Sequence, residues 1–327
     1  MTTQIPDAAT DPRIDANIRP FLAELNSDPA PFWLLPGEQV RATLAGLQAT
    51  TPRDLGGVTV EQKDIEVDGV SVTVYIQRPE HTSGTLPVIL FLHGGVWIAG
   101  DFNNHQGLTR DLVVATGFAC VFVEYTPIPD ALYPTQLRQS FAALKWIARE
   151  GTANGLDAAH LAVAGNSVGG DLSAALSLYA KDNAGPDVPE IKVQLLLFPA
   201  LDSSTDTQSY SDFAEGRFLA RDFMKFGWDT YTPTEQTRND IYAAPLKATL
   251  EQLRGAPPAV IMTAENDPLR DEGNAYGRKL AEAGVEVTTV EYIGLIHDWM
   301  LLNPIQHVPG VQASFRHAAA DLKHYLT

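Results

Sequence analysis

A serine stands between two glycines in the pentapeptide Gly165-Asn166-Ser167-Val168-Gly169. It follows the apolar run LAVA and precedes a run with helical spacing. In so tight a turn, the residues two before and two after the serine must lack side chains. Such a turn exposes the hydroxyl in a strained backbone and aims a helix N-terminus at the reacting centre. The pattern therefore predicts a nucleophile elbow at Ser167 in preference to an ordinary Gly/Ser turn.

A serine hydroxyl is a weak nucleophile, so a general base is needed, and an acid must orient that base. With an elbow of this kind the chain order is serine, acid, histidine, which leaves the histidines after Ser167 as candidates. His297, in GLIHDWM, follows the last predicted strand and is the expected base. His317 and His324 fall on the solvated face of a predicted helix, and His307 stays open as a loop alternative.

Two aspartates could orient the base, because each follows a predicted strand. They are Asp267 in TAENDPLRDEG and Asp202 in FPALDSS. We prefer Asp267, since a turn or helix-capping role accounts for Asp202. Asp271 and Glu272 are interpreted as acids in the first turn of the next helix, which they stabilise through its dipole.

Acyl transfer builds negative charge on a carbonyl oxygen, and preorganised backbone N–H groups must meet that charge. The stretch HGGV leaves a predicted strand through two glycines, which let the backbone approach a substrate. His93 is interpreted as a structural hydrogen-bonding residue rather than a base. The candidate oxyanion donors are Gly94, Gly95, Val96 and, directly after the serine, Val168.

The elements that must position these residues alternate between strand and helix, which predicts an α/β fold with a mostly parallel sheet and helices on both faces. VTVEQKDIEV and VSVTVYIQRP, joined at Asp68-Gly69, predict an antiparallel hairpin at the sheet edge. The later strand-like runs are Leu86–Leu92, Phe118–Tyr125, His160–Ala164, Ile191–Phe198, Ala259–Ala264 and Glu286–Tyr292. The helix-like runs are Asn104–Thr116, Pro134–Glu150, Val168–Asp182, Leu246–Arg254, Glu272–Ala283 and Val311–Leu326.

Two segments interrupt this alternation, residues 1–55 and the aromatic-rich residues 203–240. We expect an N-terminal cap segment and a cap insertion that together cover the carboxyl ends of the strands, where such sheets bind ligands. Residues 56–202 and 241–327 would form the catalytic core. A closed pocket under the cap predicts short acyl substrates, roughly acetyl to hexanoyl. The weak pocket candidates are Asn166, Trp97, Phe213 and Phe218, then Phe223, Phe226 and Trp228, although packing is the preferred interpretation for most of the aromatic residues.

The composition excludes several other classes of protein. The chain has 327 residues, a formal net charge of −17 and 45% hydrophobic residues. That charge argues against nucleic acid and anionic membranes as partners. Cys120 is the only cysteine, so no internal disulfide is expected, and its apolar surroundings predict a buried filler. No secretory signal or membrane span is recognisable, and a cytoplasmic location is expected. No metal or organic cofactor is implied, a small-molecule substrate is the expected partner, and a homodimer is possible.

Taken together, the motifs resemble the hormone-sensitive-lipase-like branch of the α/β-hydrolases, also called bacterial family IV esterases, which includes acetyl esterases. HGGVWIAGD, EYTPIPDALYP, GNSVGGDLSAA, DPLRDEG and IHDW match its motifs in order, from about residue 60 to the end. The resemblance implies an α/β-hydrolase fold with a helical cap and a serine carboxylesterase with the triad Ser167, Asp267 and His297. It also favours Gly95, Val96 and Val168 as the oxyanion donors. An amidase or acyltransferase with the same triad, or a non-catalytic ligand-binding relative, remains an alternative.

Two positions depart from the family pattern. Val96 stands where the third glycine of the loop is usual, and Asn166 stands where an acid usually precedes the serine. Because valine tolerates positive φ poorly, Val96 is expected at negative φ, with its side chain beside the bound ester. Asn166 removes a charge next to the nucleophile, so the pH optimum and acyl preference of relatives cannot be assumed.

Overall fold

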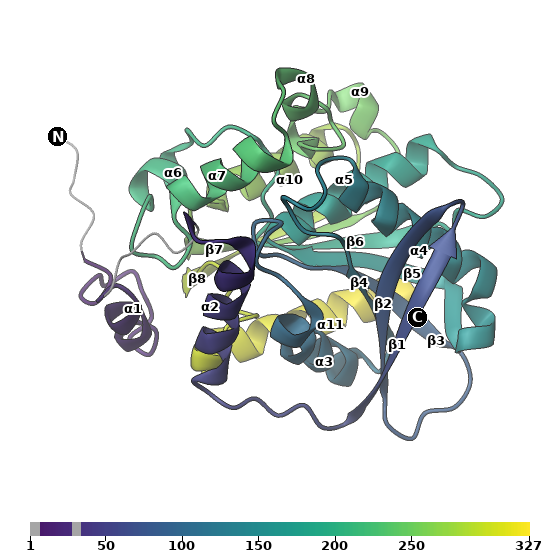
Figure 1. The fold of residues 1–327 in the computed structure, drawn as a ribbon, viewed down its shortest axis with the longest axis horizontal. Helices are drawn as coiled ribbons and strands as arrows, with labels where there is room; N and C mark the ends of the chain where they lie inside the picture. The colour runs from purple at the N-terminus through teal and green to yellow at the C-terminus, as the bar shows by residue number, and fades with distance from the viewer. Residues whose placement is uncertain (1–6, 28–33) are drawn as a thin grey trace.

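A central eight-stranded sheet organises the protein, whose computed structural model describes residues 7–27 and 34–327 (Figure 1). The strand order is β1-β2-β4-β3-β5-β6-β7-β8. β1 and β2 form the predicted hairpin around Asp68-Gly69, and β2 runs antiparallel to β4, whereas the remaining pairs are parallel. The strands are β1 (Val58–Val67), β2 (Val70–Pro79), β3 (Leu86–Leu92), β4 (Ala119–Glu124), β5 (Leu156–Asn166), β6 (Ile191–Leu197), β7 (Ala259–Asn266) and β8 (Val287–Ile296).

Helices cover both faces of the sheet. α3 (Phe102–Thr116) and α11 (Pro309–Leu326) pack on one face, and α4 (Thr135–Glu150), α5 (Val168–Asp182) and α10 (Arg270–Glu282) pack on the other. Side chains of β3 alternate between the two resulting cores, as a strand buried on both faces requires. Cys120 on β4 is buried in this core.

The two segments outside the alternating pattern lie on the left side and at the top of Figure 1. The first contains α1 (Arg19–Leu25) and α2 (Gly37–Ala49), and residues 1–6 and 28–33 of the expected N-terminal cap lie outside the described part. The second contains α6 (Gln208–Asp212), α7 (Arg221–Tyr231) and α8 (Glu235–Arg238).

A buried ion pair joins these two segments. Arg217 of the second segment donates to the Asp11 carboxylate of the first at 2.8 Å, and Arg13 donates to the same carboxylate at 2.6 Å. These contacts hold the pKa of Asp11 at about 2: burial raises it, but the hydrogen bonds and charges of the two arginines outweigh burial. The carboxylate therefore stays ionised and bridges the two segments.

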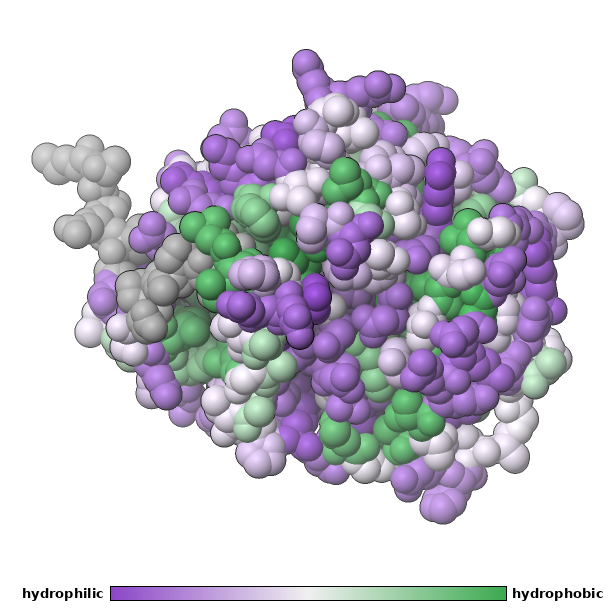
Figure 2. Space-filling view, in the orientation of Figure 1, coloured by the Kyte–Doolittle hydropathy of each residue, from purple (hydrophilic) through white to green (hydrophobic). Residues whose placement is uncertain are grey.

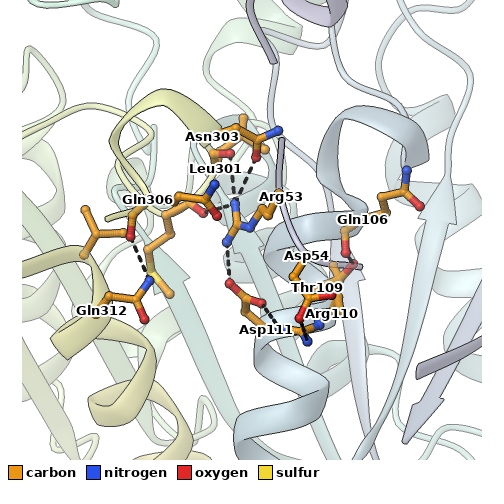
Figure 3. Close-up of polar contacts among 12 residues, drawn as sticks. Arg53, Asp54, Gln106, Thr109, Arg110, Asp111, Leu301, Asn303, Gln306 and Gln312 are labelled. Carbon is orange, nitrogen blue, oxygen red and sulfur yellow. Dashed lines mark hydrogen bonds and ion pairs between the residues drawn. The ribbon is translucent and has the colours of Figure 1, made fainter. Parts of the chain in front are cut away.

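Arg53 ties the chain after α2 to α3 and to the stretch after β8 (Figure 3). Its guanidinium donates to the Asp111 carboxylate on α3 at 2.7 Å and to the Leu301 carbonyl at 3.3 Å. Gln48, at the end of α2, donates to the same carbonyl at 2.9 Å. Leu301 belongs to the stretch that follows His297, so the N-terminal segment is fixed beside the loop that carries the expected base.

One predicted helix is wrong. Residues 246–254 form the 3-10 turn η3 (Pro245–Lys247) and the short helix α9 (Leu250–Leu253). The break has a local cause, because Thr249 caps a new helix with a capping box to Gln252, and Ala248 before it is extended. The other short 3-10 turns are η2 (Thr152–Asn154) and η4 (Asn303–Ile305). Within the described residues, no helix has the length and apolar character needed to cross a membrane.

Candidate active site

Three side chains from three strand ends form a continuous hydrogen-bonded chain. Ser167 Oγ lies 3.0 Å from His297 Nε2, and His297 Nδ1 lies 2.8 Å from Asp267 Oδ2. The second oxygen of Asp267 accepts the Leu269 N–H at 2.8 Å, which fixes the carboxylate. Ser167 follows β5, Asp267 follows β7 and His297 follows β8, so the carboxyl ends of parallel strands bring them together.

The backbone at Ser167 forms a strained strand-to-helix turn. Its φ is 56° and its ψ is −123°, between the end of β5 and the start of α5. The glycines around it have no room for side chains. A Cβ on Gly165 would lie 2.2 Å from the Gly169 carbonyl oxygen, and one on Gly169 would lie 2.1 Å from that of Leu92. The turn therefore presses the N-terminus of α5 against the end of β3.

Two carboxylates set the protonation of His297. Burial lowers the pKa of this histidine, but the charges of Asp267 and Asp298, with the hydrogen bond to Asp267, outweigh burial and hold the pKa above its ordinary value. The ring is 1% exposed, and the edge of Phe198 packs against it with ring centroids 5.2 Å apart. Such a histidine can hold a proton taken from Ser167 because the charge has partners on both sides of the ring.

The alternative acid and bases lie away from this chain. The carboxylate of Asp202 accepts hydrogen bonds from Ser204 in a local turn. His307 is exposed, and His93 is buried with its ring stacked on Tyr125, 3.9 Å between centroids. Burial lowers the pKa of His93 to about 3, so this histidine stays neutral. The predicted structural role of His93 agrees with these contacts.

The loop after β3, residues 93–100 and hereafter the oxyanion loop, corrects the expectation for Val96. Val96 has φ 53° and Trp97 has φ 57°, so both lie in the left-handed region, which valine tolerates poorly, and not at the negative φ expected for Val96. The Val96 side chain is buried against α7, where a Cβ on Gly227 would lie 2.2 Å from Val96 Cγ1. This packing keeps valine in a conformation that glycine would adopt without strain.

The candidate oxyanion donors are not equivalent. Gly94 must be removed from the expected set, because its N–H already donates to Asn166 Oδ1 at 2.9 Å. Among the described residues, none accepts a hydrogen bond from the N–H groups of Gly95, Val96 or Val168. Asn166 is also corrected as a pocket residue, since it is fully buried and both ends of its amide are bonded.

Sequence reasoning missed Asp298. Asp298 Oδ1 accepts a hydrogen bond from Asn166 Nδ2 at 2.9 Å, and Oδ2 lies 3.8 Å from His297 Nε2. Its position directly after the expected base was the only signal in the sequence.

Asp271 and Glu272 do more than stabilise the helix in which they lie. Both lie in the first turn of α10, but they bind the chain after β6. Glu272 is buried and accepts the N–H groups of Leu201 and Asp202 at 2.8 and 2.6 Å, and Asp271 accepts the N–H of Ser209 at 2.8 Å. Burial raises the pKa of Glu272 well above its ordinary value. These acids therefore hold the start of the insertion on the core.

The aromatic pocket candidates are largely packing residues. Trp97 is fully buried and stacks on Tyr231 of α7 at 4.2 Å between centroids. Phe213 is also buried, with the guanidinium of Arg270 5.5 Å from its ring centroid. Phe218 is partly buried against both main cores. Packing of this kind joins residues 213–231 to the oxyanion loop and to α10.

Comparison with known proteins identifies the class. Residues 89–301 match the family described as alpha/beta hydrolase fold. Carboxylesterase NlhH of Mycobacterium tuberculosis is 32% identical over 84% of this chain and 86% of its own length. An ethyl acetate hydrolase of Pseudomonas putida is 29% identical over 82% of each chain. The crystal structure of a thermostable esterase from Pseudomonas putida superposes with a TM-score of 0.94, at 46% identity, covering 97% of this chain and 99% of that one.

The fold and the site thus define an α/β-hydrolase with a buried serine–histidine–aspartate chain. The protein belongs to the α/β-hydrolase family, in its hormone-sensitive-lipase-like branch.

Proposed function

We propose that this protein is a serine carboxylesterase that hydrolyses short-chain acyl esters through an acyl-enzyme on Ser167. The hydrogen-bonded chain from Ser167 through His297 to Asp267, at 3.0 and 2.8 Å, carries the proposal. The names of the relatives support it, because they are a carboxylesterase, an ethyl acetate hydrolase and an esterase.

In the first half of the reaction, His297 Nε2 takes the proton of Ser167 while Oγ bonds to the ester carbonyl carbon. Asp267 accepts the Nδ1–H, which fixes the tautomer and stabilises the imidazolium. The imidazolium then gives its proton to the leaving alkoxide as the bond between carbonyl carbon and alkoxy oxygen breaks. An alcohol leaves and the acyl group stays on Ser167.

In the second half, His297 takes a proton from water, and the resulting hydroxide attacks the acyl carbon. The proton returns to Ser167 Oγ as its bond to the acyl group breaks, and the carboxylic acid is released. In both halves the carbonyl oxygen carries negative charge. We assign its stabilisation to the N–H groups of Gly95, Val96 and Val168, which have no acceptor among the described residues.

We further propose that residues 1–55 and 203–240 act as one cap over a core of residues 56–202 and 241–327. The Asp11–Arg217 pair and the hydrogen bond from Asn26 Nδ2 to the Gly216 carbonyl, 3.2 Å, support a joint cap. Ser167 and His297 are each only 1% exposed, which supports an enclosed pocket and short acyl chains. Apolar surface gathers beside α2 and α7 in Figure 2, consistent with an apolar route to the site.

An amidase or acyltransferase is the second candidate, because the same triad serves both and the leaving group is chosen by pocket shape. A non-catalytic ligand-binding role is disfavoured by the intact hydrogen-bonded chain. A cytoplasmic location and a homodimer remain predictions, which fractionation and light scattering would test.

Initial rates on 4-nitrophenyl esters of rising chain length, beside the matching anilide, test the function. We expect rates that are highest for acetyl to hexanoyl esters and low for the anilide, and that are lost in Ser167→Ala with unchanged circular dichroism. A folded Ser167→Ala protein with wild-type rates would end the esterase proposal. Efficient hydrolysis of emulsified long-chain triglycerides would refute the short-chain preference.

A further inference from the structure

Asn166, the residue before the expected nucleophile, connects three loops. Its Oδ1 accepts the Gly94 N–H from the oxyanion loop at 2.9 Å. Its Nδ2 donates to Asp298 Oδ1 at 2.9 Å, in the stretch of residues 297–302 that we call the histidine loop. Asn166 is fully buried, so no water competes for either bond. One amide therefore fixes the oxyanion loop and the histidine loop to the elbow.

The partners determine which residue types can stand at position 166. A backbone N–H only donates and an ionised carboxylate only accepts, so the side chain between them must both accept and donate. An asparagine amide does both. An ionised aspartate could accept from Gly94 but would face the Asp298 carboxylate without a proton to share. Asn166 and Asp298 are thus chemically matched.

Asp298 also brings a charge to the reacting edge of the base. Its Oδ2 lies 3.8 Å from His297 Nε2, whereas Asp267 bonds to the opposite nitrogen at 2.8 Å. Asp298 is 5% exposed and has φ 59°, a left-handed conformation uncommon outside glycine. A strained, nearly buried carboxylate held by a neighbouring amide is typical of a functional position.

We propose that Asn166 and Asp298 form a matched amide–carboxylate pair of positioning residues, which aligns the oxyanion and histidine loops on the elbow and holds a second negative charge beside His297. The inference rests on the proposed ester hydrolysis at Ser167. In the family pattern an acid precedes the nucleophile. In this protein we assign that negative charge to Asp298, which follows the base.

Asp267 and Asp298 are the charged groups that favour protonation of His297. Ser167 is neutral, and the apolar ring of Phe198 lies roughly perpendicular to the imidazole. His105 on α3 lies near Asp298, and burial lowers its pKa, as burial does for His93. Replacing Asp298 by asparagine keeps an acceptor for Asn166 but removes a charge that raises the pKa of His297. Neutral imidazole is then retained to lower pH, and the acid limb of the rate profile moves in that direction.

Three variants separate geometry from charge. Asn166→Asp places two carboxylates in contact and should lower kcat/KM about 10- to 100-fold, because the loops lose their common attachment. Asp298→Asn should shift the acid limb to lower pH, with a smaller loss in the plateau rate. The double variant Asn166→Asp/Asp298→Asn reverses the hydrogen bond and restores the charge, so it should recover most of the rate lost in Asn166→Asp. Asn183→Asp, at the exposed end of α5, is the matched control: it loses the hydrogen bond from Nδ2 to the Tyr179 carbonyl but should keep the wild-type kcat/KM and acid limb.

The experiment measures kcat/KM against pH on 4-nitrophenyl acetate, together with the His297 titration by NMR of labelled imidazole carbons, assigned with His297→Asn. Recovery in the double variant, with an acid limb near that of wild type, supports the pair. An additive double variant, or a His297 titration unmoved in Asp298→Asn, overturns it. The NMR titration does not require turnover, so it decides the inference even if the wild-type enzyme fails to cleave esters, a result that would refute the proposed function separately.

Discussion

The nucleophile elbow and the oxyanion loop both hold residues at positive φ, but different parts of the molecule keep them there. At the elbow, Ser167 is flanked by Gly165 and Gly169, which meet backbone atoms so closely that no side chain fits. In the loop, Val96 and Trp97 carry large side chains in the same left-handed region, at a cost of roughly 1–2 kcal/mol per residue.

Contacts with α7 offset that cost. Val96 packs on Gly227 of α7, and Trp97 stacks on Tyr231 of the same helix and meets the edge of Trp228. The elbow is therefore stabilised by its own sequence, whereas the loop depends on a segment more than a hundred residues away. Changes near the elbow should affect chemistry directly, and changes in α7 should affect it through the loop.

The largest loss of kcat is expected from a change in the triad that includes the elbow serine. Asp267→Asn should lower kcat by about 10⁴, as loss of the orienting carboxylate does in the serine protease triad. Asp202→Asn is the matched control and should change kcat little, because its carboxylate lies in a local turn. Steady-state kinetics on 4-nitrophenyl acetate would measure both. The reverse ranking would move the acid one strand earlier.

Gly227→Ala should displace the oxyanion loop and lower activity. The added Cβ would lie 2.2 Å from Val96 Cγ1, so α7 or the oxyanion loop must shift. A displacement near 1 Å at a catalytic group costs about 100-fold in rate, and kcat/KM should fall by that order.

Two further variants control this experiment. Val96→Gly in the Gly227→Ala background removes the clash and should restore most of the rate. Gly46→Ala in α2 has open space and should stabilise the protein slightly without touching activity. If Val96→Gly did not restore kcat/KM, the inference that α7 positions the oxyanion loop through Val96 would be wrong.

The dependence of kcat/KM on pH should report the protonation of His297. Only neutral His297 can accept the serine proton, and the charges of Asp267 and Asp298 outweigh burial and hold its pKa above the ordinary value of a histidine. The rate kcat/KM should thus fall as the pH drops through that raised pKa, with an acid limb above that expected for an ordinary histidine. A profile flat well below pH 6.5 would contradict the assignment of His297 as base.

Val96→Gly alone should have the smallest effect on stability. It relieves the left-handed strain but loses a buried side chain, worth about 1.5–3 kcal/mol, so the two changes oppose each other. We expect a Tm within a few degrees of wild type, measured by thermal unfolding. Val96→Pro is no substitute, because proline fixes φ near −65° and cannot reach 53°.

The sequence predicted what local patterns determine. The hairpin at Asp68-Gly69 and the strand before Ser167 follow from turn residues and apolar runs, and most predicted helices lie within a few residues of those observed. The triad candidates followed from chain order and strand ends. The helix over 246–254 failed because a capping box at Thr249 starts a second, shorter helix.

Long-range packing determined what the sequence could not predict. The φ of Val96 depends on Gly227, far along the chain. The loss of Gly94 as an oxyanion donor depends on Asn166, and the role of Asn166 depends on Asp298. Local propensity correctly disfavoured positive φ for valine, and tertiary contacts override that propensity.

Covalent trapping of the nucleophile tests the central claim most directly. A 4-nitrophenyl alkylphosphonate should react once per chain, release one equivalent of nitrophenol and abolish esterase activity in proportion. Peptide mass spectrometry should then place the phosphonyl group on Ser167, and Ser167→Ala should not be labelled. Stoichiometric inactivation with the label on another residue, or full esterase activity in protein fully labelled at Ser167, would contradict the acyl-enzyme mechanism.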